Sequence, residues 1–287
     1  MSRKKKDKTP PALRFIRWLF PRLERWARPL ANKLFVKIFF TPLNYPYPEK
    51  EKKAIRYAKQ FTFRAAGKNL QGYKWGDSEK YVLVVHGWAG RATQFRRFIK
   101  PLLKEGFSVV GFDGPAHGRS EGKRTNIREF EEALNKLFEL QGVPHAIIGH
   151  SFGGAAVIFA AQHGLHVKKL VAIATPTVGD WIIDTYLRAI NGSEQTKQWF
   201  KQYVLRTYGK PFDAFTASHA IQHLRYPMDL LLVYDKDDQE VAPAHAHRLK
   251  ELYPPAKLLI TSGLGHTRIL KDSRVIAWVT DYIAGNL

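Results

Sequence analysis

Residues 146–156, AIIGHSFGGAA, decide the fold of this chain. The apolar residues at the start predict a buried strand, and the small residues from Gly153 onward predict a helix that begins at once. Between them lies the pentapeptide G-x-S-x-G, with Ser151 at its centre. A turn this sharp strains the backbone of the serine and exposes its hydroxyl, so Ser151 is a candidate nucleophile. The alternative is a glycine-rich turn that serves packing alone.

A repeating alternation of strand and helix patterns extends on both sides of this turn. Near-continuous apolar runs that alternate with amphipathic stretches are typical of a parallel sheet covered by helices on both faces. Two earlier segments, residues 61–64 and 70–75, flank a Gly-containing turn and predict an antiparallel pair. The runs that predict buried strands are residues 81–85, 107–112, 146–149, 170–174, 229–234 and 257–260.

The alternation is interrupted once. Residues 178–226 contain no convincing strand and carry apolar and aromatic residues at helical spacing, which predicts a small helical cap inserted into the domain. Residues 46–177 and 227–287 are expected to form the α/β core. Residues 1–45 are a basic amphipathic segment, and three prolines within residues 41–48 predict an extended linker there.

Composition and charge limit the classes of function. The chain has 287 residues, of which 45% are hydrophobic, and this suits one large α/β domain. The lack of cysteine excludes disulfides, thiolate metal sites and a cysteine nucleophile, and it suits a reducing compartment. The formal net charge is +21, and residues 1–37 hold twelve Lys or Arg against Asp7 and Glu24. A basic arm of this kind points to an anionic surface, either lipid or nucleic acid.

Residues 12–40 have the pattern of a basic amphipathic helix, with apolar residues at helical spacing and arginines between them. Pro21 and Pro29 are expected to divide this pattern into short helices. Two interpretations stay open: a helix that lies on an anionic membrane, to which Trp18 and Trp26 add interfacial character, or a helix whose apolar face packs on the domain. We expect neither a cleavable signal peptide nor a spanning helix, because charged residues and prolines interrupt every apolar stretch. The predicted location is cytoplasmic, with any membrane binding peripheral on the inner face.

A serine hydroxyl is a poor nucleophile at neutral pH and needs a base to accept its proton. His266, in a glycine-containing loop after the last predicted strand, is the candidate base. Three aspartates, Asp235, Asp237 and Asp238, follow the preceding predicted strand. When the serine lies in such a strand-to-helix turn, the acid and the histidine follow it in this order along the chain.

Four motifs in order along the chain carry a family resemblance: residues 86–88 HGW, 113–120 DGPAHGRS, 149–153 GHSFG and 235–243 DKDDQEVAP. Together they resemble the motifs of the α/β-hydrolase superfamily, in its serine esterase and lipase-like branch, over residues 60–287. Two positions depart from the family pattern, because Ala116 and Asp235 stand where the family has glycine. The resemblance implies an α/β-hydrolase fold: a mostly parallel central sheet flanked by helices, with a small helical cap insertion.

The resemblance also implies roles for single residues. It aligns Asp238 with the acid of the catalytic triad, with Asp237 as the alternative and Asp235 as a weaker one. It implies that the backbone N–H groups of Trp88 and Phe152 form the oxyanion hole, which stabilises the negative charge that develops during acyl transfer.

Other polar residues within these motifs are expected to have structural roles. His86 is expected to shape its turn, and Asp113, His117 and Ser120 to close a second tight turn. His150 precedes the candidate nucleophile, and we expect it to pack or to form hydrogen bonds rather than to catalyse.

The predicted function is hydrolysis of carboxylic esters through an acyl-serine intermediate on Ser151, with His266 as base and Asp238 as its orienting acid. The substrates include lipid or other apolar acyl esters if the N-terminal segment binds membranes, and neither a cofactor nor a metal is expected. Thioester, amide or peptide and carbon–carbon hydrolysis on the same triad are alternatives. So is a non-catalytic binding protein with this fold. Specific nucleic-acid binding is not expected, because the sequence has no recognition module.

Overall fold

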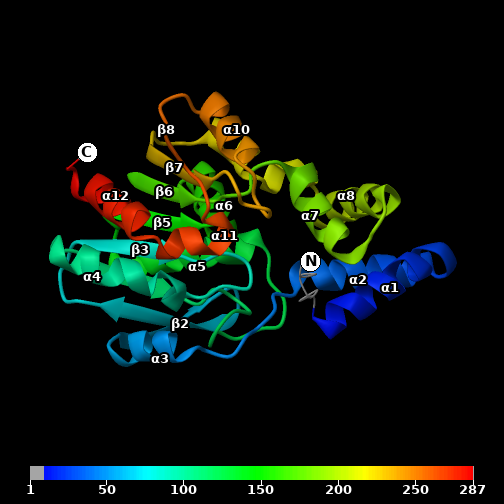
Figure 1. The fold of residues 1–287 in the computed structure, drawn as a ribbon, viewed down its shortest axis with the longest axis horizontal. Coiled ribbons are helices and arrows are strands. Elements are labelled where there is room, and N and C mark those ends of the chain that lie inside the picture. Colours follow the sequence, from blue (N-terminus) through cyan, green and yellow to red (C-terminus); the bar gives the residue numbers. More distant parts are fainter. Residues whose placement is uncertain (1–9, 287) are drawn as a thin grey trace, which may run out of the picture. The chain divides into compact units, whose positions relative to one another are not determined.

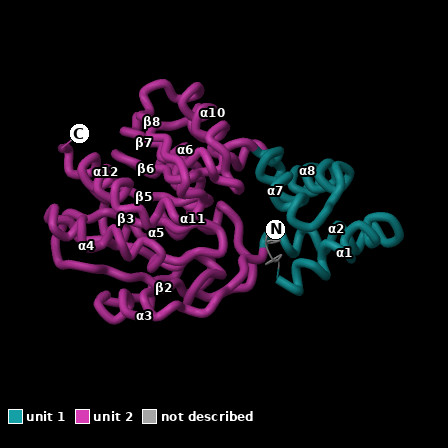
Figure 2. The backbone as a smooth tube through the Cα atoms, viewed as in Figure 1, with its two compact units in different colours: residues 1–40, 179–212 teal, residues 41–178, 213–287 magenta. Residues whose placement is uncertain are grey.

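The computed structural model describes residues 10–286, which fall into two compact units (Figure 2). The first, here called the core unit, comprises residues 41–178 and 213–287. The second, here called the helical unit, comprises the described residues up to Phe40 together with Gly179–Phe212. Residues 1–9, the first part of the predicted basic segment, lie outside the described range.

The core unit contains one eight-stranded sheet (Figure 1). Its strand order is β1-β2-β4-β3-β5-β6-β7-β8. β2 is antiparallel to both β1 and β4, and every other pair is parallel. The predicted fold class is therefore confirmed. The strands are β1 Lys59–Ala65, β2 Lys68–Trp75, β3 Tyr81–Val85, β4 Ser108–Phe112, β5 Ala146–His150, β6 Lys169–Ile173, β7 Asp229–Asp235 and β8 Lys257–Thr261.

Successive side chains of a strand point to opposite faces of the sheet, so strands that are apolar throughout make both faces apolar. Helices cover both of these faces. In β3, Leu83 and Val85 pack in one apolar layer with α5 and α6, whereas Val82 and Val84 pack in another with α4 and α12. All four side chains are fully buried. The helices of the core unit are α3 Glu49–Arg56, α4 Arg96–Lys104, α5 Ile127–Gln141, α6 Phe152–Gln162, α9 Ala217–Ala220, α10 Ala244–Leu252, α11 Gly265–Arg268 and α12 Ser273–Ala284, with 3-10 turns at Ala92–Phe95, Ile221–His223 and Ile269–Lys271.

A buried ion pair between residues far apart in the sequence anchors the start of the core unit. Residues 41–48 form neither helix nor strand, as predicted, and lead into α3. Glu51 on α3 accepts hydrogen bonds from Arg91 Nε and Thr93 Oγ1, both at 2.8 Å. Arg91 also donates to the Tyr45 carbonyl oxygen in the linker, at 2.6 Å. Glu51 and Arg91 are both buried, so this pair holds the linker and α3 against the loop that follows β3.

We expect Glu51→Ala to destabilise the core unit by about 3–5 kcal/mol, because it leaves the buried Arg91 charge without its partner. Urea denaturation followed by circular dichroism measures the loss. Glu49→Ala is the matched control on the same helix, because Glu49 pairs with Lys52 at the surface, and little change is expected there. Equal effects of the two substitutions would contradict the role given to Glu51.

The helical unit consists of α1 Pro11–Trp26, α2 Arg28–Phe40, α7 Gly179–Ile190 and α8 Glu194–Tyr208. Its interior is aromatic: the ring centroids of Phe35 and Phe200 are 5.0 Å apart, and those of Phe39 and Phe200 are 4.6 Å apart. Phe20 of α1 is also fully buried. The N-terminal segment and the inserted segment, which the sequence analysis separates into two parts, thus supply the helices of one unit.

The prolines of the N-terminal segment differ in their effects. α1 continues through Pro21, where the sequence predicts a division. Pro21 has no N–H for the Arg17 carbonyl oxygen four residues earlier, and the Asn191 side chain donates to that oxygen at 3.4 Å. The predicted division at Pro29 is confirmed, because Ala27 has non-helical dihedral angles and Pro29 lies at the second position of α2. No helix within residues 10–286 is long and apolar enough to cross a bilayer.

Candidate active site

The candidate residues follow β5, β7 and β8, whose carboxyl ends lie at the same edge of the sheet. Ligand sites in open α/β sheets form at this edge. Ser151 connects β5 directly to α6 with φ 52° and ψ −124°. Residues other than glycine rarely adopt this backbone conformation. Its own N–H donates to the Ile173 carbonyl oxygen at 2.8 Å, which holds the strained turn against β6.

Glycines allow the neighbouring chains to approach this turn. A Cβ atom at Gly153 would lie 2.3 Å from the Val85 carbonyl oxygen, a distance that no real Cβ contact has. A Cβ atom at Gly87 would lie 2.8 Å from Ser151 Cβ. The end of β3 and the loop after it therefore pack directly on the candidate nucleophile only because these two positions lack side chains.

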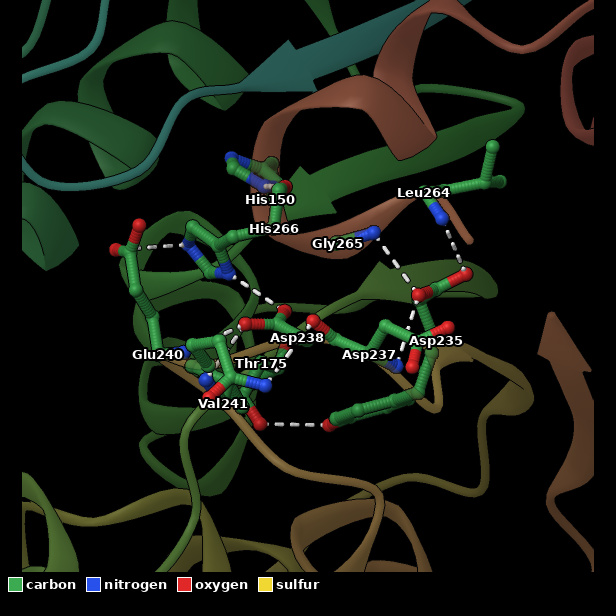
Figure 3. Close-up of polar contacts among 12 residues, drawn as sticks. His150, Thr175, Asp235, Asp237, Asp238, Glu240, Val241, Leu264, Gly265 and His266 are labelled. Carbon is green, nitrogen blue, oxygen red and sulfur yellow. Dashed lines mark hydrogen bonds and ion pairs between the residues drawn. The ribbon is translucent and has the colours of Figure 1, made fainter. Parts of the chain in front are cut away.

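Asp238 and His266 form a hydrogen-bonded pair (Figure 3). His266 Nδ1 donates to Asp238 Oδ2 at 2.8 Å, and the other carboxylate oxygen accepts from the N–H groups of Glu240 and Val241. Burial alone raises the pKa of Asp238. The hydrogen bond and positive charge of His266 and the two N–H donors outweigh burial and lower this pKa below its ordinary value. The acid is thus held ionised, with the proton on Nδ1 and Nε2 left as the basic nitrogen of the neutral ring.

The other two candidate acids hold the loop that carries His266. Asp235 is fully buried, and its carboxylate accepts from the N–H groups of Gly265 at 2.9 Å and Leu264 at 3.1 Å (Figure 3). Asp237 accepts from the Gly263 N–H at 2.6 Å. Within the described residues, neither carboxylate forms a hydrogen bond with the His266 ring. The geometry therefore favours Asp238 over both alternatives as the partner of His266.

Ser151 and His266 are not joined by a hydrogen bond within the part of the chain that the structure describes. His266 Nε2 instead lies 3.7 Å from the Glu240 carboxylate, which is 64% exposed, and Figure 3 shows the ring between Glu240 and Asp238. Two of the three predicted triad residues are thus in direct contact, and the serine is not hydrogen-bonded to them.

His150 contributes to the site in a way that the motif alone did not specify. Its Nε2 donates to the His266 carbonyl oxygen at 2.9 Å, and the two rings are 4.8 Å apart between centroids. Burial, followed by the charge of His266, lowers the pKa of His150 to about 3. The ring is therefore neutral at physiological pH and fixes the backbone of the candidate base. The sequence shows that His150 is next to the candidate nucleophile, but only the fold shows that its hydrogen-bond acceptor is the His266 carbonyl oxygen.

The side chains of the two residues predicted to supply the oxyanion donors are in contact. Phe152 is the first residue of α6, and the Trp88 ring lies edge-on to the Phe152 ring at 5.2 Å. Within residues 10–286, neither of these two backbone N–H groups donates to another protein group. His117 holds the loop beside Trp88, because its Nε2 accepts from the Ala89 N–H and its Nδ1 donates to the Pro115 carbonyl oxygen. The two N–H groups thus have no acceptor within the described residues, which the predicted role requires.

The residues expected to shape turns form structural hydrogen bonds. Asp113 is fully buried and accepts from the hydroxyl groups of Tyr47 at 2.8 Å and Tyr73 at 3.1 Å. His86 Nε2 accepts from the Gly114 N–H, and burial lowers the pKa of His86 to about 4. Ala116, which replaces a family glycine, has φ 65° and keeps the backbone conformation that glycine would supply.

Comparison with known proteins agrees with this fold. A family profile described as "alpha/beta hydrolase fold" matches residues 80–186. An esterase of Pyrococcus furiosus, Pf2001, superposes with a TM-score of 0.63 over 85% of this chain and 96% of the esterase, at 20% sequence identity. The chain thus has the fold of the α/β-hydrolase superfamily and resembles this superfamily in sequence. At this level of identity the structural likeness speaks for the fold alone.

Curated relatives of this chain match over shorter stretches. A serine hydrolase-like protein of Danio rerio is 32% identical over 127 residues, which are 42% of this chain and 39% of the relative. A monoacylglycerol lipase of Mycolicibacterium smegmatis is 30% identical over 92 residues, which are 29% of this chain and 32% of that enzyme. The chain thus aligns with 32% to 39% of the length of these two relatives.

The ionisation of His266 generates a prediction. Burial lowers the pKa of His266, but the Asp238 hydrogen bond and the charges of Glu240 and Asp238 outweigh burial and raise this pKa above its ordinary value. We expect Glu240→Gln to lower the pKa of His266, because it removes a negative charge that favours the protonated ring. Titration of the ring Cε1–H signal by NMR measures this pKa, and the signal is identified by its loss in His266→Gln.

Glu251→Gln is the control for this measurement, since Glu251 is equally exposed, at 64%, and pairs with Arg248 instead. The pKa of His266 should not change in this variant. The effect of Glu240→Gln should shrink at high salt, because water and ions screen an exposed carboxylate. An unchanged or raised pKa in Glu240→Gln would contradict the interaction.

Proposed function

We propose that this protein cleaves carboxylic esters through an acyl-serine intermediate, with Ser151 as nucleophile, His266 as base and Asp238 as the acid that orients the base. The observation that carries the proposal is the Asp238–His266 hydrogen bond at the sheet edge that also bears the strained Ser151 turn. A histidine whose Nδ1 proton is held by a carboxylate, at the sheet edge that bears such a turn, is what nucleophilic catalysis by serine requires.

The proposed reaction has two steps. In the first, His266 Nε2 accepts the Ser151 proton as Oγ attacks the ester carbonyl carbon, and the protonated ring then gives this proton to the leaving alcohol. In the second, His266 removes a proton from water, which attacks the acyl-serine carbonyl carbon. The protonated ring then returns the proton to Ser151 Oγ as the acyl–Oγ bond breaks, and the carboxylic acid is released. Asp238 stabilises the charged ring in both steps. This route requires His266 Nε2 to turn from Glu240 toward Ser151. Catalytic hydrogen bonds often tighten only when substrate is bound.

The oxyanion of each tetrahedral intermediate would accept from the backbone N–H groups of Trp88 and Phe152. Removal of one donor aimed at such an oxygen typically raises the activation free energy by about 3–4 kcal/mol. The N-terminus of α6, where Phe152 lies, also favours negative charge. Because the Trp88 contribution comes from the main chain, substitution of its indole should affect the shape of the acyl pocket more than the chemistry.

Carboxylic esters are favoured over thioesters, amides and carbon–carbon bonds by the relatives. The names of two matched proteins, monoacylglycerol lipase and monoglyceride lipase of Homo sapiens, refer to ester hydrolysis. Both match only about a third of their own length. Acyl esters of glycerol or other apolar acyl esters are therefore the first substrates to test.

The ester series from p-nitrophenyl acetate to p-nitrophenyl palmitate tests the proposal. We expect hydrolysis by the wild type and a loss of kcat of about 10⁴-fold or more in Ser151→Ala, because no nucleophile remains. Ser273→Ala, an exposed serine at the start of α12, should retain full activity. Failure of the wild type to cleave any member of the series would overturn the ester assignment and leave the fold unaffected.

The identity of the acid is tested separately. Asp238→Asn should reduce kcat by about 10⁴-fold, because an amide cannot stabilise the charged ring and favours the wrong tautomer. Asp237→Asn should stay within about tenfold of the wild type, since Asp237 contacts the loop backbone and not His266. The reverse order of the two variants would assign the role to Asp237.

A further inference from the structure

Helix α1 presents an exposed aromatic face. Phe15, Trp18 and Trp26 lie three, eight and eleven residues apart, and are therefore on one side of the helix. Their exposed fractions are 58%, 53% and 78%, which are high for side chains of this size. Phe15 and Trp18 stack on each other with ring centroids 5.9 Å apart. Leu30, at the start of α2, is also 58% exposed.

The opposite face of α1 is fully engaged within the helical unit. Phe20 is completely buried there. Arg17 Nε donates to the Ala189 carbonyl oxygen at 2.8 Å, and the Glu24 carboxylate accepts from the Ser193 N–H at 2.9 Å and its hydroxyl at 2.6 Å. These bonds fix the rotation of α1 about its own axis. The aromatic face is therefore a stable surface of the folded unit, and not the unpaired side of a loose helix.

The charges around this face are positive. Arg14, Arg22, Arg25 and Arg28 are exposed. The Arg22 guanidinium lies 4.2 Å from the centre of the Trp18 ring, and that of Arg25 lies 4.9 Å from the centre of the Trp26 ring. Glu24 is the one acidic residue between positions 10 and 40, and its carboxylate is bound to Ser193. The exposed side of α1 thus combines large apolar rings with arginines and has no acidic side chain.

This combination matches the chemistry of a membrane interface. Tryptophan rings favour the headgroup region of a bilayer, and arginine forms paired hydrogen bonds with phosphate groups. An amphipathic helix that is rich in arginine lies in the plane of such an interface, with its apolar side chains below the phosphates. A DNA duplex would engage the arginines but offers no apolar phase to a helix with several half-exposed aromatic and aliphatic side chains.

We propose that α1 binds the headgroup region of an anionic phospholipid bilayer, with Phe15, Trp18 and Trp26 inserted between lipids and Arg22 and Arg25 on lipid phosphates. Binding is peripheral and lies in the plane of the bilayer. The proposal concerns the helical unit alone and does not depend on the esterase activity of the core unit.

Sedimentation with phosphatidylcholine vesicles, with and without phosphatidylserine, tests this surface in the full chain. We expect the wild type to bind the anionic vesicles and to be released by salt. Trp18→Ser/Trp26→Ser keeps every charge, and should weaken binding by at least about tenfold because apolar insertion is lost. Arg22→Glu/Arg25→Glu should weaken it by about 25-fold or more.

Two matched controls lie on the core unit. Tyr57→Ser removes a ring that is 73% exposed, and Lys100→Glu/Lys104→Glu makes the same charge change on the exposed side of α4. Both should bind vesicles like the wild type. All variants should keep the wild-type melting temperature and the wild-type rate on a soluble ester, because the altered side chains are exposed and distant in sequence from the candidate site.

Wild-type binding by Trp18→Ser/Trp26→Ser would overturn the proposal, since it would mean that charge alone, including that of residues 1–9, accounts for attraction. Equal losses in the core-unit controls would overturn it as well. So would displacement of the wild type from anionic vesicles by an equal concentration of duplex DNA, with the same dependence on Trp18 and Trp26. None of these results would bear on the proposed esterase.

Discussion

The close approach of β3, β5 and α6 around Ser151 is the constraint on which the rest of the core unit depends. Gly87 and Gly153 leave space for backbone where any side chain would collide, and this allows a residue with φ 52° to remain in a well-packed turn. Next to this turn, the N–H groups of Trp88 and Phe152 have no protein acceptor among residues 10–286. Strain, glycine positions and free donors are thus three aspects of one local packing arrangement.

A second set of contacts, made by carboxylates and a histidine, positions the candidate base. Asp235 and Asp237 hold the backbone before His266, Asp238 holds its ring, and His150 holds its carbonyl oxygen. These groups come from the ends of three strands, so the geometry of the base depends on the register of the whole parallel sheet. The residue in contact with Nε2 is Glu240, which is bound only weakly by its surroundings because it is exposed.

The sequence predicted the parts of this structure that local patterns encode. Apolar runs located the strands, two of the four motifs contain Ser151 and Asp238, and the loop after the last predicted strand contains His266. Long-range pairing was not predictable in this way. The local sequence pattern of α3 does not indicate that Glu51 is buried and paired with Arg91. The sequence shows that Asp235 replaces a family glycine, but it does not show that the Asp235 carboxylate accepts a hydrogen bond from the Gly265 N–H. Pro21 was expected to divide its helix because its compensating donor, Asn191, lies far away in the sequence.

The division of the helical unit between two distant chain segments has a consequence for synthesis. α1 and α2 leave the ribosome before the first strand of the sheet, yet their apolar partners on α7 and α8 end only at residue 208. At bacterial or eukaryotic elongation rates this delay is roughly ten to thirty seconds. During that time the nascent chain exposes aromatic side chains that are covered in the folded unit, among them Phe20, Phe35 and Phe39. The contacts that finally cover them join residues far apart in the sequence. The helical unit therefore cannot complete its core until α7 and α8 have been made, although half of it is made first.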